Sequence, residues 1–164
     1  MEEAWTQFEA WVTANGGRHT SERRLLYEVV CELPRLFDVD ALVAQLAAHE
    51  EQGGMRLSRA TAYNTLTAFV KAGLLVPVST MSGKVYVRAH GRDVVLVQEC
   101  TECGALQVLK ATGGVGQAVA HLAFRGFTPQ RSTVLVNGLC ARCAKALKKR
   151  EKQKTQIKNN ERKS

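Results

Sequence analysis

The sequence predicts an α+β fold, in which an N-terminal winged helix-turn-helix is followed by a small α/β domain with a four-cysteine zinc site. Three observations support this prediction. Helical patterns fill the chain up to residue 73, strand patterns begin directly after it, and two CxxC pairs enclose the last strand-rich part. We therefore expect a winged-helix domain over residues 1–88, a small α/β domain over 89–146 and a basic tail over 147–164.

The first three helices are predicted from apolar spacing and from capping residues. Trp5, Phe8 and Trp11 recur at roughly helical spacing and indicate the first helix. Thr20 is well placed to N-cap the second helix, and Asp38 starts the third.

The fourth helix carries the first functional signal. Ser58 is expected to cap it and Gly73 to end it. One face is apolar and is expected to join the core, namely Ala62, Leu66, Phe69 and Val70. The opposite face carries mostly small, neutral residues, with Arg59 at its N-terminal end and Tyr63 at its edge: Ala60, Thr61, Asn64, Thr67, Ala68 and Lys71. A plain solvated face usually carries more Glu and Lys, so this face favours close approach to base edges in a major groove.

After the fourth helix the chain follows the period of β-strands. LLVPV and KVYVR indicate a hairpin around STMSG. Further on, VVLVQ, ALQVL and STVLVNG read as strands and VGQAVAHLAF as a helix. Together these segments predict the compact α/β domain.

The formal net charge of +8 is concentrated in the tail. Residues 148–164 hold eight Lys or Arg and two Glu, a net of +6, whereas the rest of the chain has a net of only +2. Because Ile157 is its only aliphatic residue, the tail is expected to be disordered or a frayed helix. A solubilising segment and a phosphate tether are both consistent with this charge.

The composition also limits the cellular location. No stretch approaches the roughly 18 consecutive apolar residues that a membrane span needs. The N-terminal segment MEEAWTQFEAW lacks the basic and then apolar pattern of a signal peptide. We therefore expect a cytoplasmic protein, in which thiols stay reduced and paired cysteines suggest a metal ion.

Four of the five cysteines form two CxxC pairs, Cys100 with Cys103 and Cys140 with Cys143. Four thiolates in a tetrahedron suit Zn²⁺ and leave no open coordination position, so we predict one structural zinc ion per chain. Redox disulfides are the alternative. Cys31 is expected to be a buried core thiol on the second helix.

No catalytic residues can be assigned. The sequence offers no nucleophile-and-base pair, no phosphate-binding loop and no open metal site, so an enzyme is the weakest interpretation. The histidines are scattered along the chain, and only His90, with Asp93 nearby, comes close to ligand spacing: His19, His49, His90 and His121.

In combination, these motifs resemble the ferric uptake regulator (Fur) family of bacterial metal-responsive repressors. RHTSERRLLYEVV is similar to the Arg-x-Thr-x-x-Arg motif at the family's second helix, and SRATAYNTLTAFVKAGLL is similar to its recognition helix. The two spaced CxxC pairs match its structural zinc site. The resemblance covers about residues 10–144.

The resemblance implies a homodimer that binds double-stranded DNA, typically an AT-rich inverted repeat, with the second domain pairing the subunits. Arg23 would probe the minor groove or the backbone, Tyr63 would meet a base edge, and Thr61 matches the family threonine. Asn64 stands where the family usually has arginine, which implies a different preferred operator. The expected DNA-binding residues are Arg18, Thr20, Arg23, Arg59, Thr61, Tyr63 and Asn64.

The chain departs from the family where the regulatory metal binds. Apolar residues occupy the usual ligand positions before the first CxxC, at the start of the third helix, in the wing and after the first CxxC: Val94, Val95, Leu96, Val97, Leu36, Phe37, Val87 and Val108. Apolar side chains cannot donate a lone pair, so we expect that regulatory metal sensing is lost or relocated.

Two other functions stay open at this stage. One is a regulator of the same fold that responds to haem or another ligand bound in its second domain. The other is a nucleic-acid or protein adaptor that uses the basic tail and the cysteine pairs.

Overall fold

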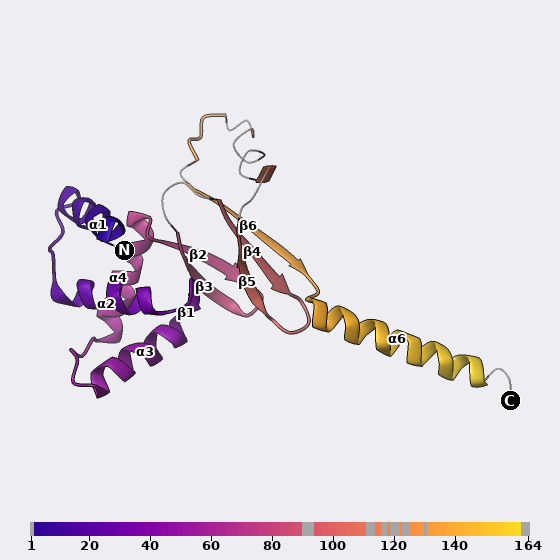
Figure 1. Cartoon of the computed structure of the whole chain (residues 1–164). Helices are drawn as coiled ribbons and strands as arrows, with labels where there is room; N and C mark the ends of the chain where they lie inside the picture. Colours follow the sequence, from indigo (N-terminus) through magenta and orange to yellow (C-terminus); the bar gives the residue numbers. More distant parts are fainter. Residues whose placement is uncertain are drawn as a thin grey trace.

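The structure is a computed structural model of the chain (Figure 1). It describes residues 2–89, 94–110, 114, 115, 118, 122, 125–129 and 131–161. The predicted α+β fold class is confirmed: four helices and a small sheet form an N-terminal unit (residues 2–89), and a second sheet and a long helix belong to a C-terminal unit (residues 94–161).

The helices of the N-terminal unit are α1 (Glu2–Ala14), α2 (Ser21–Glu32), α3 (Val39–Glu51) and α4 (Arg59–Ala72). The three predicted N-caps are confirmed, because the side chains of Thr20, Asp38 and Ser58 each accept a hydrogen bond from a backbone N–H of the first helical turn. Gly73 ends α4 in the left-handed conformation, at φ 88°.

One apolar core joins these helices. Phe69 of α4 is fully buried and packs edge-on against Phe8 of α1, with ring centroids 4.8 Å apart. Tyr27 of α2 lies 5.1 Å from the Trp5 ring. The predicted recognition helix therefore packs on aromatic side chains from α1 and α2.

The first sheet is antiparallel and has the order β1-β3-β2, with β1 at Leu36–Asp38, β2 at Leu75–Thr80 and β3 at Gly83–Arg88. The hairpin β2–β3 was predicted. Strand β1 was not, because three residues are too few to show a period of two.

The second sheet has the order β5-β4-β6, with β4 at Val94–Cys100, β5 at Leu106–Leu109 and β6 at Ser132–Gly138. Strands β4 and β6 are parallel, and Cys100 is opposite Gly138. Most of the helix predicted for VGQAVAHLAF lies outside the described residues, as do His90, Asp93 and His121.

The two sheets share a second apolar core. Val76, Val78, Val85 and Val87 of the first sheet cluster with Val95 and Val97 of β4. Val95 and Val97 are separated by one residue, so they lie on the same face of β4. This core joins the two units directly.

The C-terminal helix α6 (Ala141–Glu161) extends away from the rest of the molecule (Figure 1). Of the two expectations for the tail, disorder or a frayed helix, the structure shows a helix as far as Glu161. Helix-favouring Lys, Arg, Glu and Gln dominate this segment, and its side chains from Lys145 to Gln156 are exposed. Within the described residues, no helix combines the length and apolar character that crossing a membrane requires.

Candidate nucleic-acid interface and metal centre

Helix α4 separates its buried and exposed faces sharply. Ala62, Leu66 and Phe69 are buried in the core, whereas Tyr63 is 50% exposed and Asn64 is exposed beside it. The sequence of α4 contains no acidic residue. Its outer face therefore presents hydrogen-bonding groups without a charge that would repel phosphate.

A hollow of about 320 Å³ lies beside this face and is formed with the end of α1 and the start of α2. Among its lining residues are Arg23 and Asn64, both predicted DNA contacts, together with Asn15, Thr67 and Lys71. The structure thus brings residues of two separate motifs onto one surface. Asn15 is the member of this set that sequence reasoning missed, since nothing local marks the end of α1 as part of the surface.

The loop before α2 is held by its own arginine. Nη1 of Arg23 donates to the backbone oxygen of Arg18 at 2.6 Å. An added Cβ on Gly17 would lie 2.9 Å from a methyl group of Val12, so the loop packs closely on α1. Arg18 is exposed on this loop. Arg23 is half-buried and supports the loop that carries Arg18.

Two predicted contact residues have hydroxyl groups that are engaged at helix N-termini. The Thr20 hydroxyl accepts from the backbone N–H of Arg23 at 3.4 Å. The Thr61 hydroxyl lies 2.8 Å from that of Ser58, the N-cap of α4. Arg59 lines a different hollow, between α3 and α4, together with Arg56.

The four paired cysteines meet at one edge of the second sheet. Because β4 and β6 are parallel and in register, their carboxyl ends lie side by side and bring Cys100 next to Cys140. The backbone N–H of Cys140 lies 3.3 Å from the Cys100 sulfur. Each CxxC pair forms its own tight turn, and the two turns have the same hydrogen bond. Gly104 N–H donates to Cys100 O and Ala144 N–H donates to Cys140 O, each at 2.9 Å.

The donor set fits a zinc ion. All four sulfur atoms lie within 4.8 Å of one another, and those of Cys103 and Cys140 are 3.8 Å apart. Four sulfurs about 2.3 Å from a tetrahedral Zn²⁺ would be roughly 3.8 Å apart. Four soft thiolates without a carboxylate or an open position are typical of a structural site.

The surrounding groups favour thiolate at one end of the cluster. The backbone N–H groups of Cys140 and Cys103 lower the pKa of Cys100 to about 6. Hydrogen bonding with the Cys140 and Cys103 sulfurs raises the pKa of Cys143 to about 12. Several adjacent thiols cannot all ionise without a cation, and a bound Zn²⁺ would remove this conflict.

Most of the positions at which the family resemblance led us to expect regulatory ligands also meet, but as apolar packing. Strand pairing places Leu36 opposite Val87 and Val97 opposite Val108. These four residues join Val95 in the core between the two sheets. The other three take different places: Phe37 is in the first core, and Val94 and Leu96 are half-buried.

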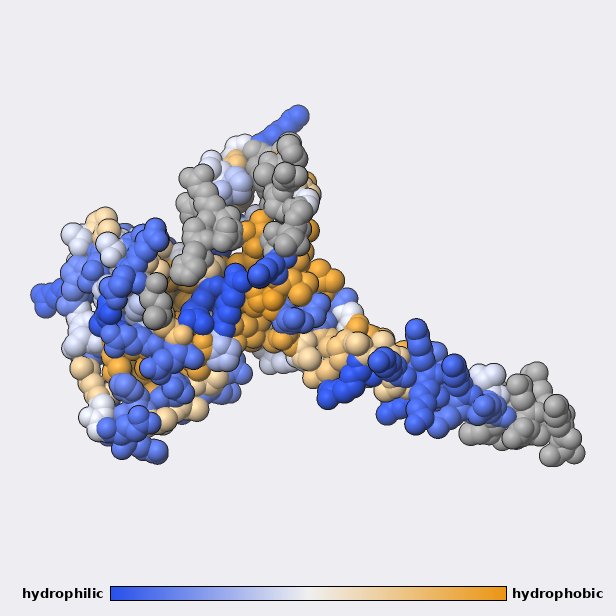
Figure 2. All heavy atoms as spheres, viewed as in Figure 1, coloured by the Kyte–Doolittle hydropathy of each residue, from blue (hydrophilic) through white to orange (hydrophobic). Residues whose placement is uncertain are grey.

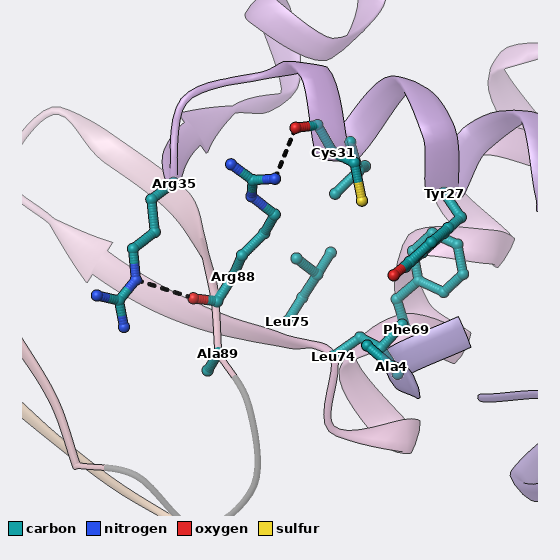
Figure 3. Close-up of a pocket in the computed structure, with 10 residues that line it drawn as sticks. Ala4, Tyr27, Cys31, Arg35, Phe69, Leu74, Leu75, Arg88 and Ala89 are labelled. Carbon is teal, nitrogen blue, oxygen red and sulfur yellow. Dashed lines mark hydrogen bonds between the residues drawn. The ribbon is translucent and has the colours of Figure 1, made fainter. Parts of the chain in front are cut away.

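A cavity of about 460 Å³ lies within the N-terminal unit, between α2, α4 and the base of the hairpin (Figure 3). The Cys31 thiol lines it; Cys31 packs against the first core as expected, but it is half-buried rather than fully buried. Arg88 donates from Nη1 to Cys31 O at 2.7 Å and from Nη2 to Leu33 O at 2.8 Å, which satisfies free carbonyl groups at the end of α2.

Comparison with protein-family models matches residues 14–135 to the Ferric uptake regulator family. No curated protein matches the chain. Among solved structures, the Helicobacter pylori ferric uptake regulator Fur superposes with a TM-score of 0.63 at 14% identity, covering 87% of this chain and 93% of that one.

Two further structures extend this likeness of fold. The ferric uptake regulator from Pseudomonas aeruginosa with manganese gives a TM-score of 0.61 at 18% identity, covering 81% of this chain and 97% of that one. A zinc uptake regulator complexed with zinc and DNA gives 0.55 at 20% identity, covering 88% and 95%.

Proposed function

Since the chain belongs to the ferric uptake regulator family of DNA-binding transcription regulators, we propose that it is a homodimeric, sequence-specific regulator that has lost the family's metal sensing. The observation that carries the DNA-binding part is the exposed, acid-free face of α4, held rigidly by aromatic core packing. Tyr63 and Asn64 would read base edges, and Arg18, Arg59 and Lys71 would contact phosphates. The family resemblance favours an AT-rich inverted repeat as the operator.

The four-cysteine cluster would have a structural role. Cys100, Cys103, Cys140 and Cys143 would hold one Zn²⁺ that joins the end of β4 to the start of α6. A closed set of four thiolates leaves no position for substrate or water, which supports folding rather than catalysis as its purpose.

The outer face of the second sheet supports a homodimer. Leu96 is paired with Val134 and with Leu109, and all three lie on the face that turns away from the N-terminal unit. Val136 on the same face is 49% exposed, and Leu139 next to it is 42% exposed. Figure 2 shows this apolar surface over the second sheet. A second copy of the chain would cover it.

Loss of metal sensing is supported by the core between the sheets. Val87 and Val97 have no exposed surface, and Val95 is 1% exposed. The apolar side chains of this cluster offer no donor atom to a divalent cation.

The test is DNA binding by the purified, zinc-containing protein near physiological salt. Operators are first selected from random DNA, and affinity is then measured with and without added ferrous iron or manganese. We expect tight, selective binding that ignores both metals. Binding that requires either metal would overturn the loss of sensing, and a failure to select any preferred sequence would overturn specific DNA recognition.

The cavity beside Cys31 favours one second candidate, a regulator that responds to a small apolar molecule. A volume of about 460 Å³ is within the range of ligand sites, and Phe69 of α4 forms part of its wall. The probe is anilinonaphthalene sulfonate, a dye with apolar aromatic rings and one sulfonate group. Val30→Phe is the variant that fills the cavity. This candidate requires dye binding that the variant abolishes and that changes operator affinity. Dye binding unaffected by Val30→Phe would contradict it.

A further inference from the structure

Strand β2 connects the recognition helix α4 to the turn of the hairpin, and the C-terminal unit holds it at both ends. At the first end, Arg131 donates from Nη2 to Gly73 O at 3.1 Å and from Nη1 to Leu75 O at 3.3 Å. At the other end, a carboxylate oxygen of Glu99 accepts from the backbone N–H of Met81 at 2.9 Å. Each of these hydrogen bonds joins residues of different units.

The end of α4 is shaped to receive Arg131. Gly73 has φ 88°, a conformation that side chains disfavour, and an added Cβ would lie 2.6 Å from Nη2 of Arg131. A guanidinium at this point also faces the free carbonyl groups at the helix C-terminus, where positive charge is stabilising. The remaining nitrogen, Nε, is buried and has no partner among the described residues. The guanidinium of Arg131 therefore bonds to the backbone at the junction between α4 and β2.

Glu99 is unusual for its surroundings. Its side chain is 2% exposed, whereas Val95 and Val97 on the same face of β4 belong to the apolar core. One carboxylate oxygen is buried without a partner in the described part of the chain. Burying an acid with so few hydrogen bonds is costly, and an apolar residue would cost less. Glu99 accepts a hydrogen bond from the Met81 backbone N–H, which Val or Leu at this position could not do.

The first CxxC turn lies against the same part of the hairpin. An added Cβ on Gly104 would be 3.1 Å from the Ser82 hydroxyl oxygen. The tip of the hairpin thus contacts both Glu99 and the turn that carries Cys100 and Cys103. The rest of the hairpin packs in the apolar core between the sheets. Polar groups at both ends of β2 and one apolar layer fix the two units together.

From this geometry we propose that Arg131 and Glu99 are positioning residues that set the distance and angle between the two recognition helices of the dimer. The inference rests on the proposed function, a homodimer that binds two half-sites. Because each recognition helix is joined to its own C-terminal unit at both ends of β2, the pair can fit only one separation of half-sites. One additional base pair moves a half-site by about 3.4 Å and rotates it by about 34°. A rigid pair should therefore tolerate only one spacer length.

The test compares a single half-site with inverted repeats whose spacers differ from the selected one by −2 to +2 base pairs. Arg131→Met removes the hydrogen bonds to Gly73 and Leu75 and keeps most of the apolar stem. Arg125→Met is the matched control, because Arg125 is exposed and belongs to the same unit. Zinc content and dimer mass are measured on each variant, so that a change in spacer preference is read only on assembled protein.

We expect Arg131→Met to bind the single half-site within about twofold of the unchanged protein and to bind the selected repeat about tenfold more weakly, because two linked sites benefit only when geometry lets both engage. Its affinity should also depend less on spacer length. An equal reduction on half-site and repeat would overturn the proposal, since Arg131 would then act on α4 alone. An unchanged spacer profile would overturn it as well.

Glu99 provides an independent variant. Glu99→Leu cannot accept from Met81, whereas Glu99→Gln keeps an acceptor oxygen. Only Leu should flatten the spacer profile, and only Leu should speed hydrogen exchange at the Met81 amide. If Gln and Leu behave alike, the hydrogen bond does not position the hairpin. If the unchanged protein itself prefers the repeat no more than the half-site, then the proposed dimeric function has failed, which is a different result.

Discussion

At the edge of the second sheet four thiols lie within 4.8 Å of one another, whereas an apolar cluster packs between the two sheets at positions where the family resemblance led us to expect metal ligands. Both regions hold distant parts of the chain together. The first depends on donor atoms that can release a metal ion, and the second depends on burial of methyl groups, which no metal concentration changes.

Under the proposed loss of metal sensing, this difference would keep the two units in one arrangement whether or not a regulatory metal is present. Coordination between two units can act as a switch because the ion comes and goes. The packing of Leu36, Val87, Val95, Val97 and Val108 joins the same two units without an ion. The four-cysteine cluster fits a structural zinc ion, which would support folding.

The largest effect is expected at the cysteine cluster. Cys103→Ser should abolish zinc binding and unfold the C-terminal unit, because a structural zinc can contribute about 10–16 kcal/mol of apparent binding free energy. The N-terminal core is separate, so the fluorescence of buried Trp5 should stay native-like. Zinc content, dimer mass and tryptophan emission measure this. Cys31→Ser is the control and should keep its zinc. A folded, dimeric Cys103→Ser protein would contradict the structural role.

The apolar region should respond more moderately. Val97→Ala should lower the free energy of unfolding by about 2–3 kcal/mol, because it removes fully buried methyl groups between the sheets. Added manganese should not restore the stability. Denaturant unfolding measures the change, with Leu147→Ala as the control, since Leu147 is 42% exposed on α6. Equal destabilisation of both variants would show that the two sheets are not tightly packed against each other.

Recognition of DNA should depend directly on neither the four-cysteine cluster nor the apolar core between the sheets. Tyr63→Ala should weaken binding to the selected operator by about 1–3 kcal/mol, because the exposed ring would no longer meet a base edge. Its thermal unfolding should be unchanged, since Tyr63 is 50% exposed. Tyr63→Phe separates the ring from the hydroxyl group. An unchanged preference for operator over random DNA would exclude base readout by this face of α4.

Much of this architecture follows from local sequence signals. Capping by Thr20, Asp38 and Ser58 depends on residues within one helical turn, and for that reason these helix starts were predictable. The four-cysteine cluster was predictable because CxxC spacing forces each pair into one turn. The hydrogen bonds of Arg131 to Gly73 and Leu75 span more than fifty residues, and no local pattern marks them.

Other features depend on tertiary packing that a single sequence does not reveal. That Leu36, Val87 and Val97 would meet required the registers of three strands. Strand β1 exists only because β3 offers it an edge. The cavity beside Cys31 results from how α2 and α4 pack, and side-chain identity alone does not predict empty volume.

The smallest effect is expected from the basic helix. Deleting residues 148–164 leaves Cys143 and its turn intact and removes a net charge of +6. If α6 touches DNA, the dependence of log affinity on log salt should become shallower, by about 0.9 for each phosphate that is no longer neutralised. Preference for operator over random DNA should not change, because phosphates carry no sequence information. Replacing Lys148, Lys149 and Arg150 with Gln in the full chain provides the matched control for length. An unchanged slope would show that α6 does not contact DNA, whereas a reduced preference would mean that this helix helps to position the dimer.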